Sequence, residues 1–192
     1  ENRDNPESSA PCHRVKNTKF LPGGAGNVAA NLKSLGAEVV LFGILGKDEN
    51  GECLIRELNN LGINHKLIFN GEIKTIVKQR ILSNSDGRCH CRLDFGDSDH
   101  EIEKIKSLSY QIAKELKNSV KNDFSSCIIS DYGKGFITQE LIEIIQELNS
   151  LVYVDPKNNS LEYKNIELIK PNRKELQHLA QGQNQEEKVR NL

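Results

Sequence analysis

Apolar segments of strand length alternate with helical patterns through most of this 192-residue chain. Val39–Leu45 is a continuous apolar run bounded by glycines, which is typical of a strand buried on both faces, and a helical pattern over residues 52–61 follows it. This order predicts right-handed crossovers and an α/β fold with a mainly parallel sheet. The alternation resumes further along the chain, with helices over 101–120 and 139–149, strands over 125–130, 151–154 and 166–169, and a last helix after residue 172.

Residues 75–95 interrupt this alternation and predict a β-hairpin. Two arms rich in strand-forming residues flank a turn-like segment over 83–87. The hairpin has two interpretations: it covers a pocket and aims cations at an anionic substrate, or it is an exposed edge whose charges limit aggregation. Strand alternation places the charged residues of each arm on one face, Lys78 and Arg80 on the first arm and His90, Arg92 and Asp94 on the second.

The stretch Gly23-Gly24-Ala25-Gly26-Asn27 predicts a tight turn that enters a short helix. Val28, Leu32 and Leu35 share one helical face, and Gly36 follows where a C-terminal cap belongs. Free N–H groups at a helix start attract anions or polar oxygens. Asn27 either caps the helix or presents its amide to a ligand, and spacing alone leaves an ordinary glycine-rich loop equally open.

Charged and polar residues follow three successive predicted strands. Because ligands of parallel sheets bind at the carboxyl ends of strands, this clustering favours a site for a polar ligand or a phosphate. Turn chemistry is the alternative, since Asp and Gly are ordinary turn residues and Asn-x-x-Glu is a variant of the helix capping box. The strand-end residues are Asp131 and Lys134, Asp155 and Lys157, and Asn172 and Glu175.

Composition excludes several classes of protein. The net charge is −1, the basic residues are balanced by acids, and no apolar run is long enough to span a bilayer, so neither nucleic acid nor membrane is an expected partner. Five scattered cysteines predict reduced thiols in a cytosolic protein rather than a disulfide framework. Strand alternation points His90 away from Cys89 and Cys91, which disfavours a zinc site there and favours packing of the two thiols as small apolar groups.

The two ends of the chain predict that material is missing from both. No Met occurs, even at position 1, and residues 1–10 and 181–192 are polar and lack periodicity. Residues 1–10 resemble the inside of a loop rather than the start of a fold. We therefore expect residues 1–192 to form a partial domain.

Together these motifs resemble the ribokinase-like (PfkB) carbohydrate kinases over residues 10 to about 180. The amino-terminal signature of that family is similar to Gly23–Ala29, to the helix exit at Gly36-Ala37 and to the turn from Gly46 to Gly51. Further motifs resemble one branch, the D-glycero-β-D-manno-heptose 7-phosphate kinases, which are often fused to an adenylyltransferase. These motifs are Ile129–Gly135, Asp155-Pro156-Lys157, Lys170–Glu175, and Thr75–Lys78 with Arg92–Phe95.

The resemblance implies a ribokinase-like, doubly wound sheet with helices on both faces and a small β lid over about residues 70–96. The implied reaction transfers the γ-phosphoryl group of ATP, with Mg²⁺, to the anomeric hydroxyl of D-glycero-D-manno-heptose 7-phosphate, a step toward the ADP-heptose precursor of lipopolysaccharide. Positioning and charge stabilisation supply the catalysis of such a transfer. It also implies a cytoplasmic homodimer that pairs through the lid.

The resemblance also implies a role for each candidate residue. Gly23, Gly24 and Asn27 would line the sugar pocket. Lys78, Arg80 and Arg92 would meet the substrate phosphate. Asp131, Lys134 and Lys157 would face the sugar phosphate or the transferred group, with Lys157 supporting catalysis. Asn172 and Glu175 would position nucleotide phosphates and Mg²⁺, for Glu175 either directly or through water.

One family motif is not found in this sequence. The Gly-Ala-Gly-Asp motif that supplies the catalytic base would lie several dozen residues beyond Glu175, so the segment by itself is expected to be inactive. Two alternatives therefore stay open: another PfkB-family sugar kinase of the ribokinase or fructokinase type, or a catalytically incomplete remnant that only binds sugar phosphate.

Overall fold

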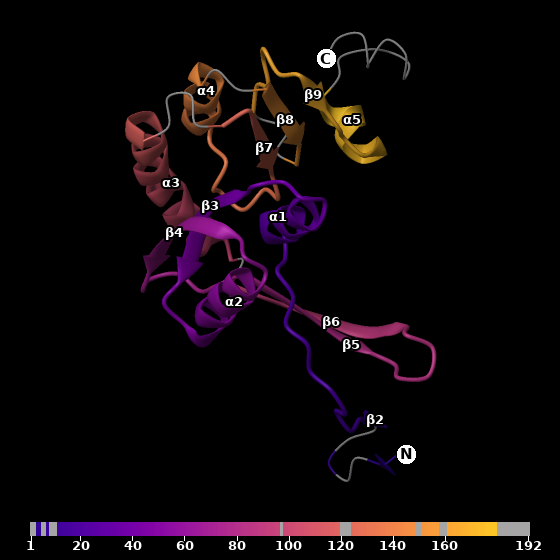
Figure 1. Ribbon diagram of the computed structural model, residues 1–192. Helices are drawn as coiled ribbons and strands as arrows, with labels where there is room; N and C mark the ends of the chain where they lie inside the picture. The colour runs from indigo at the N-terminus through magenta and orange to yellow at the C-terminus, as the bar shows by residue number, and fades with distance from the viewer. Residues whose placement is uncertain are drawn as a thin grey trace.

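The computed structural model describes residues 3–4, 7, 11–96, 98–119, 124–148, 151–157 and 161–179 (Figure 1). Its main strands run parallel, as the sequence predicts, in two hydrogen-bonded groups. Residues 181–192, which the sequence shows to be polar and without periodicity, lie outside the described residues. The first group pairs β3 (Val40–Gly46) with β4 (Asn64–Asn70), and the second contains β7 (Ser126–Ser130), β8 (Leu151–Asp155) and β9 (Leu168–Ile169).

Five helices accompany these strands in the described chain. Side chains cap the starts of several helices: Asp48 accepts a hydrogen bond from the Gly51 N–H, Thr138 accepts one from the Leu141 N–H, and Asn172 accepts one from the Glu175 N–H. The predicted glycine cap at Gly36 is confirmed, since this residue has φ 91° and its N–H donates to the Lys33 carbonyl. The helices are α1 (Ala25–Ser34), α2 (Glu49–Asn60), α3 (Asp99–Ser119), α4 (Gln139–Glu147) and α5 (Arg173–Leu179).

One main core lies between α3, α4 and the strands β7 and β8. It receives Phe42, Ile44 and Ile68 from β3 and β4, so the two strand groups share it. This core stabilises the strand ends that carry the candidate site, because apolar burial is the dominant favourable term in folding. Its buried members are Ile112, Ala113, Leu116, Ile129, Leu141, Ile142, Ile145, Leu148, Val152 and Val154.

The predicted apolar face of α1 is only partly buried, since Val28 and Leu32 are half-buried and Leu35 lies just beyond the helix end. Leu35 is 83% exposed, whereas Ala29 is 3% exposed and Gly26 is also buried. The helix packs by its small residues because its backbone approaches closely: a Cβ on Gly26 would lie 3.1 Å from the Cβ of Pro22. The hydrophobic spacing of Val28, Leu32 and Leu35 therefore did not identify the most deeply buried positions of the helix, which are Gly26 and Ala29.

The predicted hairpin is confirmed. It consists of β5 (Val77–Leu82) and β6 (Cys89–Phe95), which pair antiparallel, and Figure 1 shows it projecting from the rest of the molecule. We call it the lid. Both strands are exposed along almost their whole length, including Cys89 and Cys91, so the predicted packing of these two thiols as buried apolar groups is wrong.

The amino-terminal segment contains two short strands, β1 (Arg3–Asp4) and β2 (Pro11–Cys12), which pair antiparallel. The prediction of a plain loop over residues 1–10 therefore missed β1. Just beyond β2, the ring of His13 stacks on His90 of the lid at a centroid distance of 5.9 Å.

All five cysteines are free thiols, as predicted. None of the described helices combines the length and the apolar character needed to cross a bilayer.

Candidate functional site

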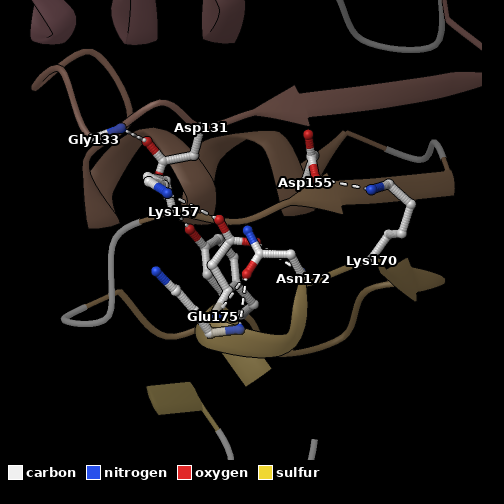
Figure 2. A network of polar contacts seen from close by, with 9 residues as sticks. Asp131, Gly133, Asp155, Lys157, Lys170, Asn172 and Glu175 are labelled. Carbon is white, nitrogen blue, oxygen red and sulfur yellow. Dashed lines mark hydrogen bonds and ion pairs between the residues drawn. The ribbon is translucent and has the colours of Figure 1, made fainter. Parts of the chain in front are cut away.

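The polar ends of β7, β8 and β9 meet at one edge of their sheet (Figure 2). Ser130 pairs with Asp155 in the parallel register, and the Asp131 N–H then donates to the Asp155 carbonyl at 3.0 Å. The Lys170 N–H donates to the Val154 carbonyl at 2.9 Å. The structure thus brings the three predicted strand ends into one cluster.

Asp131 is the most deeply placed carboxylate of the cluster, with 6% of its surface exposed. One carboxylate oxygen accepts the Gly133 N–H at 2.8 Å, and Gly133 has φ 63°, a backbone conformation that favours glycine. The other oxygen accepts the Tyr163 hydroxyl at 3.3 Å. Asp131 therefore holds the turn after β7 in shape, as the turn-chemistry interpretation of this residue predicts.

Tyr163 is a member of the cluster that the sequence did not reveal. It lies in the segment between β8 and β9, and its hydroxyl reaches back to Asp131. Burial raises the pKa of Tyr163, and the charge of Asp131 and the hydrogen bond to it raise that pKa further, so the phenol is a stable donor. An isolated tyrosine in a polar loop carries no pattern that would have identified it.

Glu175 connects β8 to the start of α5. One carboxylate oxygen accepts the Asn172 N–H at 2.7 Å, and the Asn172 side-chain oxygen accepts the Glu175 N–H at 3.0 Å. This reciprocal pair is the capping box that the sequence offered as the alternative for Asn172-x-x-Glu175. The other oxygen of Glu175 lies 3.2 Å from the Lys157 ammonium.

Glu175 is ionised in this environment. Its burial by itself raises the pKa, but the Asn172 N–H, the Lys157 ammonium and the charge of Lys170 together bring the pKa of Glu175 below its ordinary value. Lys157 keeps about half of its side chain exposed, so it faces both Glu175 and the open side of the cluster. A cation placed in this way can contact an anion while it remains anchored.

The residues present do not fit direct coordination of Mg²⁺ by Glu175. Magnesium requires oxygen ligands in octahedral geometry and is usually held by carboxylates together with water and phosphate. Both oxygens of Glu175 already accept from protein donors, one of them a lysine. Within the described part of the chain, no three His, Cys, Asp or Glu side chains gather as a metal site. We derive no step through a metal bound to Glu175.

Asp155 and Lys134 occupy the margin of the cluster. Asp155 lies 3.4 Å from the Lys170 ammonium, a pair that Figure 2 shows beside the other contacts. Lys134, in the turn after β7, is half-buried. The sequence singled out both residues, but it did not indicate that Lys170 pairs with Asp155.

The glycine-rich turn borders this cluster. Gly24 is the N-cap of α1 with φ 53°, and a Cβ placed on it would lie 3.6 Å from the Tyr132 ring. Asn27 lies inside the first turn of α1, and its side chain makes no hydrogen bond to any described residue. The capping role offered for Asn27 is therefore wrong, and its exposed amide is available to a ligand.

The lid presents its cations on a single face. Lys78 lies opposite Asp94, and Arg80 lies directly opposite Arg92. Asp94 forms ion pairs with Lys78 and with Arg92, each at 3.0 Å. Arg80 has no ion-pair partner among the residues that the structure describes. Two cations therefore share the Asp94 carboxylate and Arg80 adds a third positive charge, which leaves this face positive.

Comparison with solved structures shows that the chain has a ribokinase-like α/β fold. A carbohydrate kinase from Agrobacterium tumefaciens superimposes with a TM-score of 0.65 at 19% identity, over 88% of this chain and 55% of that one. The tetrameric inhibited form of phosphofructokinase-2 from Escherichia coli superimposes with a TM-score of 0.62 at 21% identity, over 98% and 62%. At these identities the likeness shows the fold.

The sequence comparison is more specific. The model of the pfkB family carbohydrate kinases matches residues 2–192, and the chain belongs to this family. Bifunctional protein HldE from Haemophilus influenzae strain PittEE is 36% identical over 191 residues, which are 98% of this chain and 38% of that protein. The protein of the same name from Psychromonas ingrahamii is 34% identical over 173 residues, 88% of this chain and 35% of its own length. The chain thus spans between 35% and 38% of these relatives.

Proposed function

We propose that the protein is a sugar-phosphate kinase that transfers the γ-phosphoryl group of ATP to the anomeric hydroxyl of D-glycero-D-manno-heptose 7-phosphate, a cytoplasmic step toward ADP-heptose. The family and fold are those of ATP-dependent sugar kinases, which supports the reaction class. The name shared by the curated relatives supports the heptose branch.

The cross-strand pair of Arg80 and Arg92 is the observation that carries the proposal. Like charges directly opposite each other destabilise a hairpin. Asp94 neutralises Arg92 but does not pair with Arg80, so an anion bound beside Arg80 would relieve the repulsion. Guanidinium groups bind phosphate oxygens in a bidentate manner. The 7-phosphate of the substrate is such an anion, and a sugar without a phosphate would leave Arg80 without a counterion, since Arg92 already pairs with Asp94.

The glycine-rich turn is the proposed sugar-hydroxyl site. Gly23 and Gly24 let the sugar approach the backbone, and Asn27 offers an amide that both donates and accepts hydrogen bonds. Asn27→Ala is expected to raise the KM for the sugar about tenfold, the loss of roughly one hydrogen bond, and to leave the KM for ATP unchanged. An equal rise in both values would contradict this assignment.

The strand-end cluster is the proposed site of the transferred phosphoryl group. Lys157 and Lys134 would supply positive charge there, and Asn172 and Glu175 would hold the segment near the nucleotide. Asp131 would act through its turn, because both of its oxygens are already occupied by protein donors. Any Mg²⁺ that accompanies ATP would contact Glu175 only through water, and it would supply charge neutralisation on the phosphates.

A phosphoryl-transfer assay on the complete gene product tests the proposal. With ATP, D-glycero-D-manno-heptose 7-phosphate should be consumed with a kcat/KM at least about a hundredfold above that for fructose or ribose, because the non-phosphorylated sugars forgo charge-assisted hydrogen bonds. Turnover of fructose or ribose alone would indicate another sugar kinase of the same family. Binding of the heptose phosphate without turnover would indicate a remnant that has lost catalysis.

The lid is also the proposed contact of a homodimer. Ile81, Leu93 and Phe95 lie on the face opposite the arginines and are exposed. An exposed apolar hairpin face is typical of an interaction surface. Sedimentation of the complete gene product should give a dimer, and Leu93→Lys should convert it to a monomer.

A further inference from the structure

A compact cluster of polar contacts joins the base of the lid to the turn between β3 and α2. It consists of Gly46, Asp48, Gly51, Thr75 and Gly96, and we call it the hinge cluster. Gly46 ends β3, Asp48 and Gly51 start α2, Thr75 precedes β5, and Gly96 follows β6. Both ends of the lid therefore meet the body of the protein at this cluster.

Asp48 and Thr75 supply the hydrogen bonds. One oxygen of Asp48 accepts the Gly51 N–H at 2.9 Å, and the other accepts the Thr75 N–H at 2.8 Å. The Thr75 hydroxyl oxygen accepts the Gly46 N–H at 3.1 Å. Partial burial by itself raises the pKa of Asp48, but hydrogen bonding from Thr75 and Gly51 brings that pKa below its ordinary value.

The three glycines let the backbone segments approach closely. A Cβ on Gly46 would lie 2.7 Å from the Thr75 nitrogen, and one on Gly51 would lie 2.5 Å from the Gly46 carbonyl oxygen. A Cβ on Gly96 would lie 2.8 Å from the Thr75 carbonyl oxygen, and Gly96 has φ 72°. Thr75, which is 7% exposed, is therefore enclosed by backbone from both sides.

The chain changes from buried to exposed at this point. Ile73 is buried and packs with Ile105 and Leu108 of α3. Beyond Thr75, β5 and β6 are exposed almost throughout. The direction in which the lid leaves the body is thus determined near Thr75, where the last buried contacts lie.

We propose that Thr75 and Asp48 are positioning residues that set the angle of the lid, and thereby the approach of Arg80 and Arg92 to the substrate phosphate. The proposal deepens the proposed function and rests on it for the role of the two arginines. A displacement of about 1 Å at such a contact can cost a large factor in rate or affinity, because charge-assisted hydrogen bonds depend on geometry.

Substitutions of Thr75 in the complete gene product separate positioning from general stability. Thr75→Val keeps the shape and removes the hydroxyl, and it should raise the KM for the sugar phosphate about tenfold with the KM for ATP unchanged. Thr75→Ser restores the hydroxyl and should stay within about twofold of the wild type. If Thr75→Val raises both KM values equally, or leaves both unchanged, the proposal is wrong.

Thr138→Val is the matched control. Thr138 caps α4 by accepting the Leu141 N–H at 3.3 Å, so its loss removes a comparable hydrogen bond away from the lid. It should lower the melting temperature and leave both KM values at the wild-type level. Should Thr75→Val fail to fold, Asp48→Asn provides the second variant, with an expected rise of about threefold in the sugar-phosphate KM.

A readout that needs no turnover distinguishes failure of the hinge from failure of the proposed function. A fluorophore on Asn84→Cys at the lid tip, with Cys12, Cys89 and Cys91 changed to Ser, reports lid motion by time-resolved anisotropy. Thr75→Val should enlarge the nanosecond amplitude, and Thr138→Val should not. If the nanosecond amplitude is unchanged in Thr75→Val, the proposal that Thr75 positions the lid is wrong. An enlarged amplitude supports this proposal even if no sugar phosphate is turned over.

Discussion

The lid and the strand-end cluster both gather charged residues, but they do so in opposite ways. In the strand-end cluster, Asp131 and Glu175 are buried. Each of their carboxylate oxygens accepts a hydrogen bond from the protein, and for one oxygen of Glu175 the donor is the Lys157 ammonium. In the lid, Arg80 and Arg92 are exposed and lie opposite each other. Fold stability therefore depends on the first group far more than on the second.

This difference separates two kinds of functional residue. A buried, satisfied network supports the fold and orients the site at the same time, so its mutation changes stability and activity together. An exposed cation contributes little to stability, because solvent screens it. Its mutation should change binding alone.

Arg80→Ala should give the largest effect. It removes a cation without an ion-pair partner in the described chain, and the KM for the sugar phosphate should rise about fiftyfold, as expected for lost charge-assisted hydrogen bonds. The free energy of unfolding should change by less than about 0.5 kcal/mol. Arg88→Ala is the control, since Arg88 pairs with Asp86 at the lid turn, and it should leave the KM unchanged. Equal effects of both variants would show that only the total charge of the lid matters.

Glu175→Ala should destabilise the fold. It removes the capping box to Asn172 and the ion pair with Lys157, and the free energy of unfolding measured in urea should fall by about 2 kcal/mol. Glu140→Ala removes an exposed glutamate from the first turn of α4 and should cost less than about 0.5 kcal/mol. A loss of activity in Glu175→Ala without a loss of stability would contradict the role of Glu175 as a structural anchor.

Tyr163→Phe tests the contact that only the structure revealed. The variant removes the hydroxyl that donates to Asp131, so unfolding in urea should become easier by about 1 kcal/mol. Tyr110→Phe alters an exposed tyrosine on α3 and should have no measurable effect. If the two variants have the same free energy of unfolding, the hydrogen bond to Asp131 does not contribute to the stability of the fold.

Acid should weaken the strand-end cluster through protonation of Glu175. The pKa of Glu175 lies below its ordinary value of 4.5 in the folded protein, so Glu175 stabilises the fold above that pH, and this contribution is lost as the pH falls through the lowered pKa. Urea titrations between pH 6 and about pH 3 should therefore show a steeper loss of stability in the wild type than in Glu175→Gln. Identical slopes would show that the charge of Glu175 does not stabilise the folded protein.

Periodicity in the sequence determined most of the elements, because helices and strands are largely local. The buried run over 39–45, the hairpin and the long helix α3 all follow from patterns within one segment. The strand β4 was missed because its polar residues obscure the short apolar run over 67–69, and its identity as a strand depends on parallel pairing with β3. The most deeply buried positions of α1 were missed because close backbone contact, rather than hydrophobic spacing, buries Gly26 and Ala29.

Within the site, the sequence alone determined that polar residues follow three strands and that the charged residues of each lid arm share a face of that arm. Parallel strands bring their ends together, and alternation fixes which side chains share a side. Only the tertiary structure decided the partners: Tyr163 on Asp131, Lys170 on Asp155, and Thr75 enclosed against Asp48. These contacts join residues far apart in the chain, and the packing of the elements that carry them determines their geometry.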